Sequence, residues 1–350
     1  MNDFNARNSA AITWLRFPLI FLVILLHGYS VVQLQGMHPV YFGAIYPLAL
    51  WLGETGVPGF FFISGYLFFL SQKSYLHKLQ SRFHSLFIPY ILWNTLLIVA
   101  YILAYITGHP QDINGRSMAD YNITDYLRLY WDRGTYDNGN FVPILCPYWY
   151  IRNLLLLSLL SPIVWCFVKY LRELFLLGVT LWWFLTPHNA FVSQSILFFS
   201  LGAWFSIHHT CPLQFFIRHK AVFILLCAVS GLADIIFHTL CPVSVNLQIH
   251  RLALIANIPV LFILADYLAS RKHEYPLLAN AAFIVFSIHY PIIVVLRKAC
   301  VQYLGHANDA IQILLYLSCI IVATVLSLLF YMALSKFMPR LKNILSGNRS

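Results

Sequence analysis

The chain has 350 residues, of which 60% are hydrophobic and 17% aromatic, while only 10% are charged. Because a soluble domain carries about 25% charged residues, this composition excludes a soluble enzyme, a coiled coil and a disordered scaffold. The formal net charge of +10 does not indicate a nucleic-acid partner, because the basic residues fall between apolar stretches of membrane-spanning length, where positive charge marks the cytoplasmic side. We therefore expect a polytopic membrane protein whose surroundings are membrane lipid.

Apolar stretches recur along the whole chain. About twenty apolar residues cross a bilayer as a helix, although helices buried in a bundle can be shorter or broken. On this criterion the sequence predicts ten transmembrane helices, at residues 12–33, 45–70, 86–106, 149–168, 174–186, 192–207, 220–238, 252–269, 279–298 and 311–334. The short pair at 174–186 and 192–207 would also fit a tilted hairpin or a re-entrant element. The expected fold is an all-α membrane helix bundle that forms one domain over residues 1–350.

The lysine and arginine residues predict the orientation of these helices. In the ten-helix scheme, 14 of the 22 lie on the side that holds both termini, six lie on the other side, and Arg16 and Arg152 lie within helices. Cytoplasmic loops carry the excess of Lys and Arg, so we expect both termini in the cytoplasm.

The longest loop of this scheme covers residues 108–147 on the outer side. It combines carboxylates with aromatic rings at Asp112, Asp120, Asp125, Asp132, Asp137, Tyr121, Tyr126, Tyr130, Trp131 and Tyr136. Loops of this length are usually functional or disordered, and such side chains stack on sugars and hydrogen-bond to them. A solvated loop that packs over the bundle is the alternative interpretation.

Two polar residues interrupt the first apolar stretch, where an ionisable side chain costs on the order of 3 kcal/mol. Arg16 and His27 are eleven residues apart, so at 100° per residue they lie within about 20° of the same helix face and about 16 Å apart along the axis. Taken singly, the histidine could be a structural hydrogen bonder and the arginine could snorkel to the surface. Their shared face favours a functional interpretation.

The second apolar stretch joins an acid to a segment rich in glycine. Glu54 precedes residues 56–66, GVPGFFFISGY, which include Ser64. Glycine and proline in a transmembrane helix indicate a break or close helix packing. Glu54 is expected at a depth similar to that of His27, where a carboxylate would fix the imidazole tautomer and raise its basicity. A contact between Glu54 and His27 is therefore our hypothesis.

Further candidates lie in the next loop and in later helices. The basic segment 73–84 holds Lys78 and Arg82. It satisfies the positive-inside pattern by itself, or it receives a phosphorylated cytoplasmic donor, because Lys and Arg pair with phosphate. Arg152 and His289 lie in apolar stretches and would line a cavity. The seven cysteines show no CxxC or Cys/His spacing, so we expect no metal site.

Together these residues resemble acyltransferase family 3, the integral membrane acyltransferases that decorate bacterial surface glycans. The resemblance covers essentially the whole chain and rests on five segments in order. They are Arg16 with His27, residues 60–66 (FFFISGY), Arg82 with Pro89 and Tyr90, residues 149–152 (WYIR) and residues 287–291 (SIHYP). The chain departs from the family pattern at Ser85, where a second basic residue is frequent and Lys78 would have to substitute, and at Tyr290, which separates His289 from Pro291.

The resemblance implies an enzyme of the bacterial inner membrane. It would move an acyl group, usually acetyl, from acyl-coenzyme A in the cytoplasm to a hydroxyl of a cell-surface glycan or glycolipid. The expected donor-binding residues are Arg16, Ser64, Lys78 and Arg82, the expected catalytic residues are His27 and Glu54, and the expected acceptor-binding residues are Arg152 and His289. His27 would act either as a general base on the acceptor hydroxyl or as an acyl carrier, and no metal would take part.

Two other functions fit the same features. A transporter or flippase also places buried Arg, His and Glu beside broken helices, although the sequence shows no inverted repeat of such helices. A glycan polymerase would also have a large outer loop. The sequence gives no indication of the oligomeric state.

Overall fold

The computed structural model describes residues 3–28, 38–109, 111–134, 140–187, 190–271, 275–304 and 308–348. Within these residues the chain is almost entirely helical, with no strand and one isolated antiparallel bridge between Ile113 and Arg116. The all-α fold class is therefore confirmed. The end of the first expected helix, at 29–33, and residues 110 and 135–139 of the expected outer loop lie outside the described residues.

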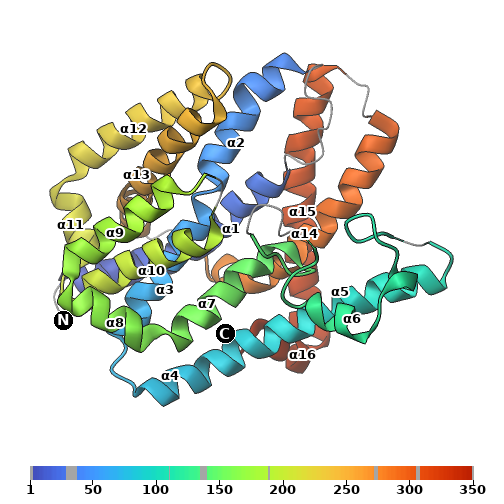
Figure 1. Cartoon of the computed structure of the whole chain (residues 1–350), viewed down its shortest axis with the longest axis horizontal. Helices are drawn as coiled ribbons and strands as arrows, with labels where there is room; N and C mark the ends of the chain where they lie inside the picture. Colours follow the sequence, from blue (N-terminus) through green and yellow to red (C-terminus); the bar gives the residue numbers. More distant parts are fainter. Residues whose placement is uncertain are drawn as a thin grey trace.

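Helix α1 (Asp3–Gly28) runs through the middle of the bundle (Figure 1). Its neighbours include α2 (Tyr46–Gly53), α3 (Gly56–Leu70), α13 (Val243–Ser270), α14 (Pro276–Leu304) and α15 (Asp309–Phe337). The side chains of Leu15, Leu19 and Ile24 are almost completely buried against these neighbours. Because α1 touches elements from both ends of the sequence, it fixes where the later helices lie relative to the first ones.

The remaining helices surround this centre. They are α4 (Tyr75–Arg82), α5 (Ile88–Ile106), α6 (Ile123–Arg128), α7 (Trp149–Leu159), α8 (Ser161–Tyr170), α9 (Arg172–Leu185), α10 (Phe191–Ile207), α11 (Pro212–Arg218), α12 (Lys220–Phe237) and α16 (Pro339–Ser346), with π-helical turns η3 (Tyr41–Ile45) and η4 (Phe83–Phe87) and 3-10 turns η5 (Met118–Asp120) and η7 (Cys146–Tyr148). Helix α12 packs beside α13 on one side of α1, and α14 packs beside α15 on the other (Figure 1).

The count of ten transmembrane helices is not confirmed. Among the described residues, six helices are long and apolar enough to cross a membrane, or up to eight if each of two bent pairs is one span. The bent pairs are α7 with α8, at 69°, and α10 with α11, at 96°. Two expected spans are missing from this set: 45–70 is divided at Glu54 into α2 and α3, and 174–186 corresponds to α9, which has only 14 residues. The described residues thus form an all-helical bundle with six to eight helices that could span a membrane, fewer than the ten expected.

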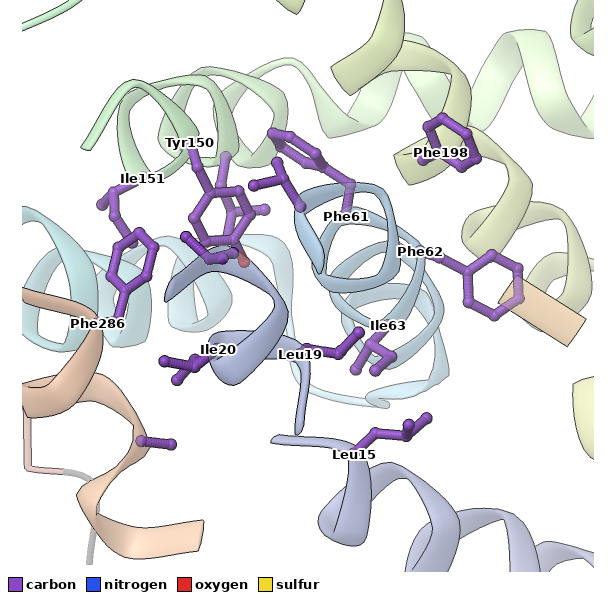
Figure 2. Packing of buried hydrophobic residues seen from close by; sticks show 14 of the residues in the cluster. Leu15, Leu19, Ile20, Phe61, Phe62, Ile63, Tyr150, Ile151, Phe198 and Phe286 are labelled. Atoms are coloured by element: carbon purple, nitrogen blue, oxygen red, sulfur yellow. The ribbon is translucent and has the colours of Figure 1, made fainter. Parts of the chain in front are cut away.

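The closest helix crossing joins α3 to α10. A Cβ atom on Gly65 would collide with the backbone oxygen of Phe199, and one on Gly202 would collide with that of Phe62. Small residues at facing positions let membrane helices approach this closely. Figure 2 shows Phe61, Phe62 and Phe198 at this crossing, beside Leu15 and Leu19 of α1. The glycine-rich segment of α3 therefore serves close packing, as the sequence predicted.

The helical run that contains α5 begins well before the span that was expected at 86–106. Residues 75–106 form one helical run through α4, η4 and α5. Helix α4 begins at an N-cap in which the Ser74 side chain accepts from the backbone N–H of His77. The basic segment expected as a loop is therefore largely helical, which fixes the spacing of Lys78 and Arg82 along one helix.

The described part of the expected outer loop forms a compact substructure, which we call the cap and define as residues 111–134 and 140–147. It has a small core of Ile98, Ile113, Met118, Leu129 and Ile144, so it packs on α5. Helix α6 starts at a capping box formed by Asn122 and Asp125. The cap therefore packs over the bundle, as the alternative interpretation of this loop expected. The expected contact of its side chains with sugars stays a prediction.

Candidate active site

A cavity of about 610 Å³ opens between α1, α3, η4, α7 and α14. Three of the expected donor-binding residues line it: Arg16, Ser64 and Arg82. Ile20, Ile63, Tyr150 and Phe286 supply apolar walls, and Figure 2 shows the Tyr150 and Phe286 rings next to each other. The structure therefore brings together three of the grouped donor-binding residues, from α1, α3 and α4.

The cavity carries positive charge without a balancing acid. No acidic side chain lines it in the described part of the chain, while Arg16 and Arg82 both do. Arg82 and Lys78 each lie over the Phe68 ring, at 5.8 Å and 5.2 Å from its centroid, so Lys78 is adjacent to the cavity although it does not line it. Such a cavity attracts a phosphorylated or otherwise anionic ligand.

Ser64 marks the inner wall of this cavity. Its hydroxyl lies 3.4 Å from the Tyr150 hydroxyl, and the ring of Tyr150 packs edge-on against Phe61. The two hydroxyls form a polar spot among the apolar side chains Ile20, Ile63 and Phe286 of the cavity lining. They are placed to hold a carbonyl or thioester group of a ligand that reaches past the arginines.

His27 lies among aromatic rings of α14. Its ring centroid is 5.5 Å from that of His289 and 5.0 Å from that of Tyr290. His289 is fully buried, and its Nδ1 lies 3.1 Å from the Val285 carbonyl oxygen. A carbonyl can only accept, so Nδ1 donates and neutral His289 keeps an unprotonated Nε2, which has no hydrogen-bond partner in the described part of the chain. The structure thus brings His27 and His289 together.

The His27 cluster adjoins the cavity. Phe286 lines the cavity and packs against the His289 ring at 5.9 Å between centroids. Arg16 and Ile20 line the same cavity from the α1 face that carries His27, as the eleven-residue spacing predicted. A ligand that enters beside Arg16 therefore points toward His27.

Glu54 belongs to a different cluster, so its expected pair with His27 is not formed. Its carboxylate lies 3.1 Å from Nε2 of His250, and Nδ1 of His250 lies 2.6 Å from the Asp234 carboxylate. Gly53, beside Glu54, packs against Leu22 and Leu26 of α1, which lie about 100–140° around that helix from His27. The helix break therefore aims Glu54 away from the histidine pair and toward α12 and α13.

Sequence reasoning missed Asp234 and His250. Helix α13 begins at Val243 rather than near 252, so His250 and Arg251 were placed in a loop although both are buried. Arg251 donates to the carbonyls of Phe184 and Thr186 at the end of α9. The carboxylate of Asp234 within an apolar stretch was a usable signal, because an intramembrane acid is expensive without a partner.

Arg152 connects the bundle to the cap. It is 6% exposed, donates to the Trp131 carbonyl at 2.7 Å and stacks on the Trp131 ring. Two of its other nitrogens lie within hydrogen-bond distance of Asn153 Oδ1. The guanidinium is therefore engaged by the protein and holds the cap in place.

In the described residues, no group of three His, Cys, Asp or Glu side chains is arranged to hold a metal ion.

Comparison with known proteins gives two matches. Residues 9–339 match the protein family described as an acyltransferase domain. The succinoglycan biosynthesis protein ExoH of Rhizobium meliloti (strain 1021) is 27% identical to this chain over 221 residues, a match that covers 58% of this chain and 55% of that protein. The matched region therefore spans about half the length of this relative. No solved structure matches the chain.

Proposed function

This chain belongs to the acyltransferase 3 family and is an acyltransferase, and we propose that it moves an acyl group from acyl-coenzyme A to a hydroxyl of a cell-surface glycan. The acyl group proposed is acetyl, and the proposed location is the inner membrane of a bacterium. The family match favours an enzyme over the transporter, flippase and polymerase alternatives. The biosynthetic role in the name of the ExoH relative supports a glycan as acceptor.

The donor would enter the cavity at Arg16 and Arg82. Coenzyme A carries several phosphates, and guanidinium groups pair with phosphate through charge-assisted hydrogen bonds. Lys78, beside Arg82 over the Phe68 ring, would add to this attraction in place of the basic residue that Ser85 replaces. The acyl arm would then extend along Ile20 and Phe286, with its thioester near Ser64 and Tyr150.

His27 would accept a proton from the acceptor hydroxyl. The hydroxyl oxygen attacks the thioester carbonyl carbon while its proton passes to the imidazole. The tetrahedral intermediate then breaks its carbon–sulfur bond, and the imidazolium returns the proton to the departing thiolate. No net proton is produced. His289, whose Nε2 has no hydrogen-bond partner among the described residues and whose ring lies beside that of His27, would orient the His27 ring.

The observation that carries this proposal is the cavity itself. It is lined by Arg16 and Arg82, with no acid among its described lining residues, and by Phe286, which packs against His289 beside His27. The proposal is tested by measuring free thiol released from acetyl-coenzyme A by the purified protein, with and without glycan acceptor. We expect release that depends on the acceptor and is lost in His27→Ala. Thiol release equal in wild type and His27→Ala would contradict the assignment.

The same preparation separates the two roles of His27. If His27 is a base, intact-mass spectrometry of the protein with acetyl-coenzyme A alone shows no added acetyl group. An acetyl adduct on a peptide that contains His27, discharged when acceptor is added, would show that His27 carries the acyl group. His77→Ala, at an exposed position of α4, is the matched control for loss of a histidine.

A further inference from the structure

The cap contains a small polar pocket of its own. Its volume is about 160 Å³, below the roughly 300 Å³ at which drug-sized ligand sites begin. Three arginines and two aspartates line it, together with Tyr121: Arg116, Arg128, Arg133, Asp125 and Asp132. A pocket of this size and polarity takes one small polar ring or group, with the rest of a longer ligand outside.

Two of the arginines are already paired with acids. Arg116 lies 2.8 Å from the Asp125 carboxylate and over the Tyr121 ring. Arg128 lies 3.2 Å from the Asp132 carboxylate. The hydrogen bond from Arg116 lowers the pKa of Asp125 below its ordinary value, so this acid stays ionised at neutral pH. The two pairs contribute no net charge to the pocket.

Arg133 is the unbalanced charge. It has no acidic partner in the described part of the chain, and its Nε is buried without a hydrogen-bond partner. Its backbone is fixed, because the Arg133 N–H donates to the Val142 carbonyl and the Arg133 carbonyl accepts from Asn114. Among the described residues, the pocket therefore presents one fixed positive charge that no acid neutralises.

Arg133 also borders the transfer centre. Its side chain interacts with Tyr290, whose ring packs against His27, and it lies close enough to His27 for electrostatic interaction. The cap cannot drift from this position easily, because Arg152 binds Trp131 and Asn94 accepts from the Leu145 N–H. The pocket and the histidine pair are thus joined through one side chain.

We propose that the cap pocket is the acceptor subsite and that it takes one sugar unit bearing an anionic group, with Arg133 as the residue that binds the anion. The inference rests on the proposed function and adds the acceptor class to it. A carboxylate on the sugar would pair with the Arg133 guanidinium, which would leave the ring among the polar side chains and a neighbouring hydroxyl directed toward Tyr290 and His27.

Binding can be tested without acyl transfer. Saturation-transfer NMR with the full chain in detergent would compare methyl α-D-glucuronide with methyl α-D-glucoside as probes. A hydrogen bond to a charged group contributes about 1.5–3 kcal/mol, so we expect the glucuronide to bind about tenfold more tightly or better. Arg133→Gln should remove this preference and Arg133→Lys should restore part of it, while Arg297→Gln, at an exposed residue of α14, should leave it unchanged.

Equal binding of the two glycosides, absence of binding by both, or glucuronide binding unaffected by Arg133→Gln would each overturn the inference. The binding test of the subsite and the thiol-release test of the proposed function can fail independently. Acceptor-dependent thiol release without a preference for the charged glycoside refutes only the subsite, whereas absence of thiol release with every acceptor refutes the proposed function.

Discussion

At the scale of single residues, Arg16 and Arg82 give the cavity lining its positive charge. Arg16 is exposed and Arg82 is partly buried, whereas Arg7 of the same helix as Arg16 is paired with Asp266 at 2.7 Å. In contrast, no acid lines the cavity beside Arg16 and Arg82 in the described residues. In our proposal, Arg7 therefore stabilises the fold, whereas Arg16 and Arg82 bind the donor.

Replacing either cavity arginine should weaken donor binding more than turnover. Arg16→Gln or Arg82→Gln removes a charge-assisted contact to phosphate, so the KM for acetyl-coenzyme A should rise about tenfold, while kcat changes little. Arg82→Lys should retain part of the affinity. The control is Lys73→Gln, an exposed position outside the cavity. A fall in kcat with unchanged KM would contradict this role.

His250 should matter for stability rather than for chemistry. It bridges the carboxylates of Glu54 and Asp234, so His250→Leu leaves two acids without their partner inside the bundle. Removing one member of a buried ion pair costs about 3 kcal/mol or more, which should lower the Tm of the purified protein by several degrees. His77→Leu, exposed on α4, should have almost no effect. Equal Tm values for the two variants would show that the cluster does not stabilise the fold.

At the scale of elements, the break between α2 and α3 is held from α13. His250 binds Glu54, and Asn257, two helical turns further along, donates to the Thr55 hydroxyl at 2.6 Å. One face of α13 therefore binds both Glu54 and Thr55 at the break, which fixes the direction of α3 relative to α2. Ser64 of α3 lines the cavity as a result.

The crossing of α3 and α10 should tolerate no added side-chain atom. Gly65→Ala places a methyl group against the Phe199 backbone, so the helices must separate, and overpacking of this kind costs about 1–3 kcal/mol. Gly178→Ala in α9 is the matched control, because nothing lies within 4 Å of its Cβ position, and alanine is favoured over glycine in a helix by about 0.5–1 kcal/mol. Thermal unfolding should rank Gly178→Ala above wild type and Gly65→Ala below it. A neutral Gly65→Ala would refute the close crossing.

At the scale of the whole molecule, we predict that the donor cavity and the cap lie on opposite sides of the membrane. Ile123 in the cap and Leu76 in α4 are both helical and are 79% and 75% exposed, so they form a matched pair for cysteine labelling. An impermeant maleimide should label Ile123→Cys in intact cells and Leu76→Cys only after lysis, against the background of the wild-type cysteines. Labelling of Leu76→Cys in intact cells would refute the predicted orientation.

Much of this arrangement was readable from the sequence because it depends on local periodicity. The spacing of Arg16 and His27 on one helix face, the close packing of the glycine segment and the membrane character of the long helices all follow from residues near one another in the chain. The partner of Glu54 could not be read, because His250 lies 196 residues away and the apolar pattern placed the start of α13 too late. The span count differs because α2 and α9 are too short to cross alone, which hydropathy does not reveal when helices are buried in a bundle.

The most direct test of the account is mass spectrometry of cell-surface glycans from isogenic strains that carry the wild-type chain or His27→Ala. We predict that one glycan loses a mass equal to an acyl group in the His27→Ala strain, with both proteins present at similar levels in the membrane. Identical glycan spectra from the two strains would contradict the assignment of His27 to acyl transfer onto a surface glycan.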